Sequence, residues 1–254
     1  MELKRLREFF SFFKSPNVGL VIWTCAMISF FFGLGYPFLP KYASSLGAEP
    51  WLIGLIFSAS SLVSSLSTLF GGFLADTAGR RKVVVVGTSV LALSCLGFAL
   101  SLSWEYFLVA SLLYGASSFY FSALYAVIAD SVPQAQLMRA LLLYAMAEHL
   151  PYSVSPLIGG FLWDLYAEDA VRITFLATSA AVAFAALARR RLLETLPSTK
   201  TPSKKELATS FVNTLSAFRS LTPSIRWLIG IRTTLLISSV SMFYTFGVLY
   251  AMEV

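Results

Sequence analysis

The chain has 254 residues, of which 57% are hydrophobic and only 13% are charged, and its mean hydropathy is +0.75. A soluble domain is about one quarter charged, and a disordered chain combines low hydrophobicity with high charge, so both classes are excluded. The single histidine excludes a cluster of histidine ligands, and the two cysteines form no CxxC pair. We therefore expect an integral membrane protein with no metal site and no cofactor.

Seven stretches are apolar enough to cross a bilayer, a span that takes about 20 mostly apolar residues. In chain order they are residues 18–39, 51–74, 83–102, 104–129, 140–163, 173–188 and 227–250. Lipid offers the backbone no hydrogen bonds, so each stretch is expected to be an α-helix. The basic start resembles the beginning of a signal peptide, but the apolar run after it is too long, and a retained first helix is expected.

Basic residues indicate how these helices are oriented, because Lys and Arg concentrate in cytoplasmic loops. With a cytoplasmic N-terminus, all but three of the 19 Lys and Arg residues fall on the cytoplasmic side; the exceptions are Lys41, Arg172 and Arg232. The net charge of +6 thus reflects membrane topology and does not indicate a nucleic-acid partner. We expect a multi-pass protein of the cell (plasma) membrane.

One long polar segment divides the chain. Residues 189–226 are rich in Pro, Ser, Thr and Lys, a composition typical of a linker. The predicted organisation is a six-helix transmembrane bundle over residues 1–188, a cytoplasmic linker over 189–226, and a seventh transmembrane helix over 227–254.

The loop after the second stretch carries the most informative motif, GFLADTAGRRK over residues 72–82. It resembles the loop motif of the major facilitator superfamily, Gly-x-Leu-Ala-Asp-Arg-x-Gly-Arg-Arg/Lys, with Thr77 in place of an arginine. Physically, Gly72 would permit close helix packing and Gly79 a left-handed turn. The resemblance implies a conformational-switch loop formed by the following residues: Gly72, Asp76, Gly79, Arg80 and Arg81.

The resemblance also implies the fold. Transporters of this superfamily have two six-helix halves, each an inverted 3+3 repeat, with substrate bound between the halves. The first six stretches would form the N-terminal bundle, and the seventh would begin a C-terminal half. We therefore expect an all-α membrane fold that represents one half of such a transporter plus one helix.

Two shorter strings suggest the drug-efflux branch of the superfamily. SPLIGGFL over residues 155–162 is similar to its antiporter motif, in which Pro156, Gly159 and Gly160 would form a kinked, closely packed helix. An ordinary kinked helix is the alternative. LETLP over residues 193–197 is similar to the end of that branch's sixth helix. The arginine that many efflux members carry in the fourth helix is absent, and Ser111 stands at its position.

Glu148 is the carboxylate that lies deep in an apolar stretch, roughly 12–14 Å from its start. Tyr144, Tyr152 and Ser155 share its helix face. Burial disfavours the charged form of a carboxylate, so Glu148 is our candidate for proton coupling. The alternative is a packing role, with Glu148 satisfied by His149 or by neighbouring hydroxyls.

Further polar side chains are candidates for the substrate path, each with a structural alternative. Tyr36 lies where Gly33, Gly35 and Pro37 break the first helix. Ser118 and Tyr125 belong to a small, polar face of the fourth stretch that lines either a cavity or a packing seam. Arg232 either snorkels to the cytoplasm or binds an anion. The complete set of path candidates is Tyr36, Ser118, Tyr125, Tyr144, Tyr152 and Arg232.

Together these features predict a secondary active transporter that moves a small molecule by alternating access, with proton-coupled export. The alternative is a truncated or non-transporting half that needs the missing C-terminal half, a partner or a second copy. An enzyme is not expected, because the sequence contains no Gly-x-Ser-Gly, no His-Glu-x-x-His and no phosphate-binding loop. The expected partners are a small-molecule substrate and the lipid bilayer, and no motif identifies the substrate.

Overall fold

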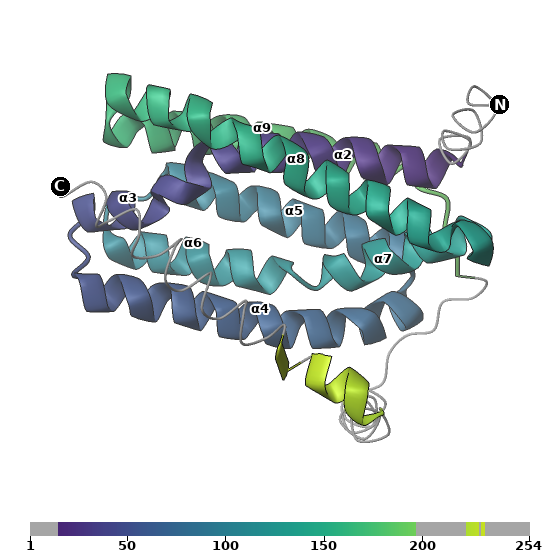
Figure 1. Ribbon diagram of the computed structural model, residues 1–254. Coiled ribbons are helices and arrows are strands. Elements are labelled where there is room, and N and C mark those ends of the chain that lie inside the picture. The colour runs from purple at the N-terminus through teal and green to yellow at the C-terminus, as the bar shows by residue number, and fades with distance from the viewer. Residues whose placement is uncertain (1–14, 197–221, 229, 232–254) are drawn as a thin grey trace.

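The computed structural model describes residues 15–196, 222–228 and 230–231, and within residues 15–196 every regular element is a helix (Figure 1). In chain order the helices are α2 (Pro16–Gly35), the 3₁₀ helix η2 (Tyr36–Phe38), α3 (Leu39–Ser45), α4 (Pro50–Ala78), α5 (Arg80–Ala99), α6 (Trp104–Ser117), α7 (Tyr120–Asp130), α8 (Gln134–Tyr166) and α9 (Glu168–Arg189). The expected all-α fold is confirmed. The seventh stretch and most of the linker lie outside the described residues, so that division of the chain stays a prediction.

Five segments of this part of the chain are long and apolar enough to cross a membrane. They are Pro16–Ser45, Pro50–Ala78, Arg80–Ala99, Trp104–Asp130 and Glu168–Arg189. Helix α8 has 33 residues and is also long enough, but it is less apolar than these five because it carries Glu148, His149 and several hydroxyl groups. The predicted fifth span is therefore a helix of sufficient length with an unusually polar sequence.

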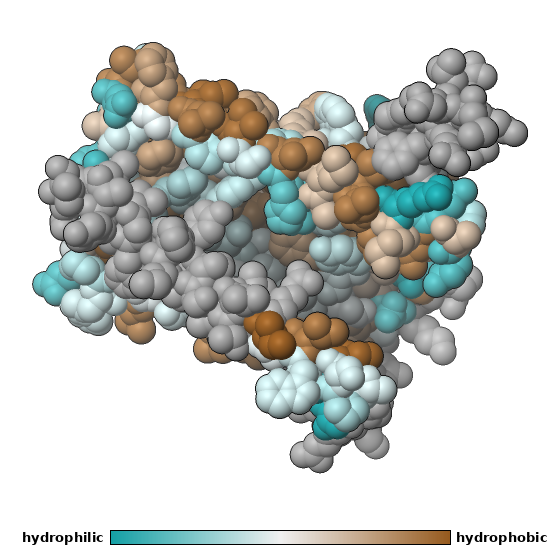
Figure 2. Space-filling view, in the orientation of Figure 1, coloured by the Kyte–Doolittle hydropathy of each residue, from teal (hydrophilic) through white to brown (hydrophobic). Residues whose placement is uncertain are grey.

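The helices pack as a bundle in two adjoining groups. Helix α2 packs against α8 and α9, while α4 packs against α6 and α7, and α5 contacts both groups. In Figure 1, α2, α8 and α9 lie along the upper side, α4 along the lower side, and α5 to α7 between them. Large hydrophobic side chains remain exposed on the outside, among them Leu142, Leu157 and Phe161 of α8. Figure 2 shows hydrophobic side chains over the upper helices and hydrophilic ones gathered at the right, where α8 begins.

The predicted bounds of four spans differ from the structure, and α8 of the fifth span begins at Gln134, before the predicted residue 140. The first span continues through η2 and α3 to Ser45, and the break expected near Tyr36 is present as the 3₁₀ turn Tyr36–Phe38. The fourth span is interrupted between Ser117 and Tyr120, where α6 ends and α7 begins. The sixth begins at Glu168, before its apolar core, because charged residues at a helix N-terminus lower the hydropathy without ending the helix.

Close packing within the bundle depends on glycine, although not on the predicted one. A Cβ atom added to Gly72 would meet nothing within 4 Å, whereas one added to Gly71 would lie 2.8 Å from the carbonyl carbon of Phe119. Gly71 is therefore the point where α4 approaches the α6–α7 junction, and the packing role predicted for Gly72 is wrong. Successive helical residues point about 100° apart, so a shift of one position moves a side chain off the interface.

Candidate functional site

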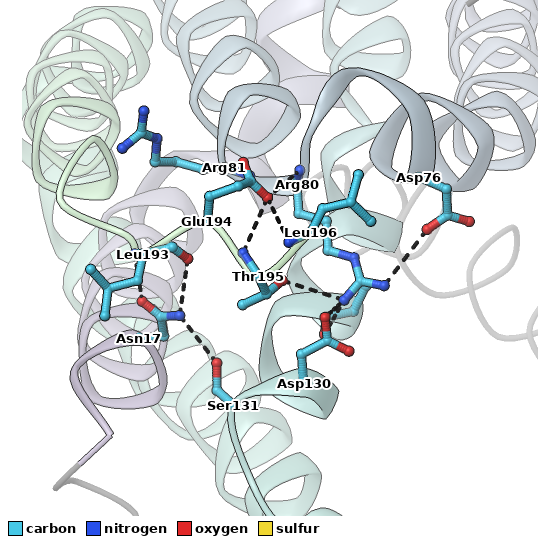
Figure 3. A network of polar contacts seen from close by, with 11 residues as sticks. Asn17, Asp76, Arg80, Arg81, Asp130, Ser131, Leu193, Glu194, Thr195 and Leu196 are labelled. Carbon is cyan, nitrogen blue, oxygen red and sulfur yellow. Dashed lines mark hydrogen bonds and ion pairs between the residues drawn. The ribbon is translucent and has the colours of Figure 1, made fainter. Parts of the chain in front are cut away.

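The loop between α4 and α5 anchors a polar network at one end of the bundle (Figure 3). Gly79 has φ 96°, a conformation that glycine adopts without strain, and this turn starts α5 directly after α4. The Arg80 guanidinium then reaches α7, where it forms an ion pair with Asp130 and donates a hydrogen bond to the carbonyl oxygen of Ala126 (3.3 Å). Its contact with Asp76 is longer, 3.7 Å.

Glu194 joins the segment after α9 to the same loop. Its carboxylate accepts hydrogen bonds from the backbone N–H groups of Arg80 (3.0 Å) and Arg81 (3.1 Å). These N–H groups begin α5 and have no partner inside the helix, so the carboxylate caps the positive end of the helix dipole. The hydroxyl of Thr195 accepts a further bond from the Arg80 guanidinium (3.4 Å). Two segments more than a hundred residues apart in sequence are thus held together.

Asn17 completes this network from the start of α2. Its amide nitrogen donates to the hydroxyl of Ser131 (3.1 Å) and to the carbonyl oxygen of Leu193 (3.1 Å), and its oxygen accepts from the N–H of Leu193 (2.8 Å). The start of α2, the loop after α4, the end of α7 and the segment after α9 therefore meet at one end of the bundle (Figure 3). This is the end that the distribution of basic residues assigns to the cytoplasm.

A second polar group lies at the opposite end of the bundle. The hydroxyl of Tyr42, whose side chain is buried, donates to the carbonyl oxygen of Ser101 (3.0 Å) and accepts from the Nε of Arg172 (3.2 Å). The ammonium group of Lys41 lies 4.8 Å from the centre of the Trp163 ring. The two basic residues that the charge count placed outside therefore lie at the end away from Arg80.

A cavity of about 440 Å³ opens between α2, α5, α6, α7, α8 and α9. Its walls combine apolar side chains, aromatic rings and a few polar groups. The polar and aromatic residues that line it are Cys25, Ser29, Phe32, Tyr36, Tyr114, Ser117, Tyr120, Phe121, Tyr144, Glu148, His149, Tyr152 and Arg189. This volume lies within the range of cavities that bind small molecules, roughly 300–1,000 Å³.

The structure brings four sequence candidates together in this cavity: Tyr36, Tyr144, Glu148 and Tyr152. Glu148 lies near the middle of α8 and is partly buried, and Tyr144, one turn earlier, is 1% exposed. The predicted shared face of α8 thus points inward. Its most C-terminal residue, Ser155, packs against Gly33 of α2. Arg232 lies outside the described residues.

The other path candidates lie elsewhere. The hydroxyl of Ser118 accepts a hydrogen bond from Ser64 (2.7 Å), and Ser60 donates to the carbonyl oxygen of Ser111 (2.6 Å). The small, polar face of α6 therefore packs against α4, and Ser111 of this face also lines a second cavity of about 280 Å³ between the two helices, together with Ser60 and Ser64. Tyr125 is 47% exposed and contacts the Tyr144 ring edge-on, with 5.2 Å between ring centres.

The antiporter-like string, residues 155–162, lies in the C-terminal half of α8. Pro156 is inside this helix, which continues past it to Tyr166. An added Cβ on Gly159 would lie 2.9 Å from the carbonyl carbon of Leu34, so this glycine permits α8 to approach α2 closely. Gly160 faces Phe38 at an ordinary distance of 3.7 Å. The string therefore forms part of the contact between α2 and α8, on the C-terminal side of the α8 residues that line the cavity.

Arg189 is the cavity residue that sequence reasoning missed, because it was counted among the basic residues of the linker. It is instead the last residue of α9 and is 1% exposed. Its guanidinium donates to the hydroxyls of Thr24 (3.1 Å) and Thr88 (2.7 Å) and lies 5.5 Å from the centre of the Tyr120 ring. Helical side chains lean toward the N-terminus of their helix, so this one runs back into the bundle. The sequence signal that could have indicated this position is the pair Thr24 and Thr88, which lie at similar depths in two apolar stretches and could accept hydrogen bonds from one buried arginine.

Comparison with known proteins agrees with this architecture. Residues 17–254 match the family described as Major Facilitator Superfamily. The chain belongs to this superfamily. Members are transporters in membranes and not enzymes, so the chain is a multi-pass membrane protein of a transporter family. The resemblance of the loop motif to this superfamily is thereby confirmed.

Several curated relatives are multidrug efflux proteins. The chain is 32% identical over 167 residues to a homolog of the multi-drug resistance efflux pump PmrA from Lactococcus lactis, covering 64% of this chain and 40% of the relative. It is 26% identical over 134 residues to the quinolone resistance protein NorA of Staphylococcus aureus, covering 52% of this chain and 34% of that one. An uncharacterized MFS-type transporter of Methanocaldococcus jannaschii is 30% identical over 149 residues, covering 58% of this chain and 38% of the relative.

Solved structures show the same fold. The human organic anion transporter TETRAN superposes with a TM-score of 0.63 at 22% identity, covering 77% of this chain and 53% of that one. A POT family transporter superposes with a TM-score of 0.63 at 15% identity, covering 92% of this chain and 47% of that one. The chain therefore spans about half the length of these structures and less than half of the curated relatives.

Proposed function

We propose that the protein is a secondary active transporter that exports a small molecule across the plasma membrane by alternating access, in exchange for protons. The superfamily and the efflux relatives support export of a small molecule. The observation that carries the coupling is the position of Glu148, a partly buried carboxylate that lines the aromatic cavity near the middle of α8. Intramembrane ionisable residues are costly and mark proton or substrate sites.

Proton exchange requires that Glu148 be reachable from the cavity and alternate between protonated and ionised forms. Its location in the lining meets the first condition, and the second requires that Glu148 bind a proton when no cation is bound there. A cationic group of the substrate would then replace the proton. Such competition for one carboxylate links the movement of substrate to the movement of protons.

Alternating access also needs an element that closes the cytoplasmic end, and the Arg80 network is our candidate. Arg80 connects α5 to α7 through Asp130, and Glu194 connects α5 to the segment after α9. We propose that these contacts hold one conformation and separate in the other. In this proposal Gly79, Asp76 and Arg81 serve the switch and do not bind substrate.

The alternative is that these 254 residues transport only together with a second bundle, supplied by a C-terminal half, a partner or a second copy. The coverage of 34–40% of the efflux relatives favours this alternative. It shares the cavity and the network with the main proposal. It differs in requiring a second chain before any transport is seen.

The test is transport of ethidium, an aromatic cation, in inverted membrane vesicles that contain the full chain. An imposed proton gradient should drive accumulation by the wild type. Glu148→Gln should abolish this accumulation but retain exchange of ethidium across the membrane. Glu105→Gln, which changes an exposed carboxylate at the start of α6, is the matched control and should behave as wild type. Gradient-driven accumulation by Glu148→Gln would disprove the coupling role, and transport seen only after co-expression of a second bundle would favour the alternative.

A further inference from the structure

Arg189 is a buried cation whose partners in the described part of the chain are neutral. Two threonine hydroxyls and the face of the Tyr120 ring surround its guanidinium, and no described carboxylate lies within ion-pair distance. Buried charges in proteins are normally paired, since hydroxyls and rings stabilise a cation without neutralising it. Thr24 on α2 and Thr88 on α5 fix the guanidinium against the cavity wall.

The same cavity holds one opposite charge and one unused hydrogen-bonding group. Glu148 and Arg189 are the two lining residues that carry a full charge at neutral pH when free in water. The hydroxyl of Tyr144, also in the lining, is buried and has no hydrogen-bond partner among the described residues. The remaining walls are largely aromatic and apolar, with Phe32 and Phe121 among them.

These charges define the chemistry of a complementary ligand. In the proposed function, the substrate and the proton compete for Glu148, so the group of the substrate that meets Glu148 is cationic. A purely anionic substrate would instead favour protonation of Glu148 and bind together with the proton. Arg189 supplies a second fixed charge in the same cavity, and a guanidinium is suited to carboxylates.

We propose that the cavity binds an aromatic zwitterion, whose carboxylate is held by Arg189 and whose ammonium group is held by ionised Glu148. The assignment of the ammonium group rests on the proposed function, whereas that of the carboxylate rests on Arg189 alone. The aromatic part lies against the rings of the wall, where stacking and edge contacts are favourable.

A matched set of four fluorescent probes separates these contributions. α-Dansyl-lysine carries a carboxylate and an ε-ammonium group, its methyl ester lacks the carboxylate charge, its ε-N-acetyl form lacks the ammonium charge, and the doubly blocked form is neutral. Binding to the purified full chain in nanodiscs is measured by dansyl fluorescence, without a proton gradient. The wild type should bind α-dansyl-lysine at least about tenfold more tightly than its methyl ester, because a charge-assisted hydrogen bond is lost in the ester.

Variants then show whether Arg189 makes this contact. Arg189→Gln should weaken binding of α-dansyl-lysine by about tenfold and leave binding of the methyl ester unchanged. Arg189→Lys should retain most of the preference for the free carboxylate. Arg190→Gln removes the same charge from the next residue, which is exposed, and should have no effect.

Two results would overturn the proposal. Wild-type chain that binds the methyl ester as tightly as α-dansyl-lysine has no carboxylate site, and this result does not depend on any variant folding. Equal loss of all four probes in Arg189→Gln, with Arg189→Lys showing the same loss, would make Arg189 a structural link between α2, α5 and α9. Retained preference for the carboxylate in a chain that fails to move ethidium, both alone and with a co-expressed second bundle, would count against the transport proposal and leave the anion site standing.

Discussion

Two adjacent glycines of α4 provide a sharp test of how the bundle is packed. An alanine at position 71 would place its Cβ 2.8 Å from the carbonyl carbon and the Cα of Phe119, whereas an alanine at position 72 would meet nothing within 4 Å. Ordinary contacts begin at 3.4 Å and the carbonyl oxygen of Phe119 lies closer still, so Gly71→Ala must move α4 away from the α6–α7 junction by more than 0.6 Å. The two variants differ in this clash but share the same change in helix propensity.

The magnitudes follow from these two effects. Replacing glycine by alanine inside a helix stabilises it by roughly 0.5–1 kcal/mol, and overpacking costs roughly 1–3 kcal/mol. Gly72→Ala should therefore stabilise the bundle slightly, and Gly71→Ala should destabilise it by about 1–2 kcal/mol. Their free energies of unfolding should thus differ by about 1.5–3 kcal/mol, and at roughly 2–4 °C per kcal/mol for a chain of this size their melting temperatures should differ by about 3–12 °C.

The buried cysteines make this difference measurable. Cys25 is 7% exposed and Cys95 is fully buried, so a maleimide that fluoresces on reacting with thiols reports unfolding of the bundle in detergent. Wild type and both variants are heated under identical conditions. Equal melting temperatures for the two variants, or a lower one for Gly72→Ala, would show that α4 does not contact the α6–α7 junction through Gly71.

Two further predictions concern topology and switching. A cysteine introduced at Glu168 should react with an impermeant reagent added outside intact cells, and one at Lys204 should not; the reverse pattern would contradict a cytoplasmic N-terminus. Asp76→Asn should slow ethidium turnover and leave its affinity nearly unchanged, because the loop lies at the end of the bundle. Asp130→Asn should slow turnover more, since Asp130 lies nearer to Arg80 than the 3.7 Å of the Asp76 contact. A large loss of affinity with normal turnover would refute the switch role.

The length of the apolar stretches and the distribution of charge predicted the helices well because membrane spans have a strong compositional signal. The break at Tyr36 was predicted because glycine and proline mark such positions in the sequence. The break between Ser117 and Tyr120 is marked less clearly, since the nearby Gly115 lies inside α6 and the residues of the break itself are serine and phenylalanine. Gly115 packs against the backbone of Ser60, so a close helix contact explains it equally well, and tertiary packing decides the position of the break.

The cavity was predicted only in part for a similar reason. Tyr144, Glu148 and Tyr152 were placed together because they lie on one helix, where spacing determines the shared face. Arg189 joins them from another helix, and its location depends on the direction in which the side chain leaves the end of α9. A positive charge beside two other arginines is typical of a cytoplasmic loop, so composition favoured the wrong location. The same limit explains the wrong prediction for Gly72. The motif indicated a closely packed glycine in this part of α4, but only the fold determines that Gly71, one residue earlier, faces the α6–α7 junction.

The most direct test of the account is the release of protons when a cation binds to the cavity. Ethidium is added at saturating concentration to the purified full chain in weakly buffered nanodiscs, and released protons are followed with a pH indicator over a range of starting pH. Wild type should release protons on binding, and Glu148→Gln should bind ethidium without releasing any. Equal proton release from both proteins, or none from the wild type at any pH, would contradict the claim that substrate and proton compete for Glu148.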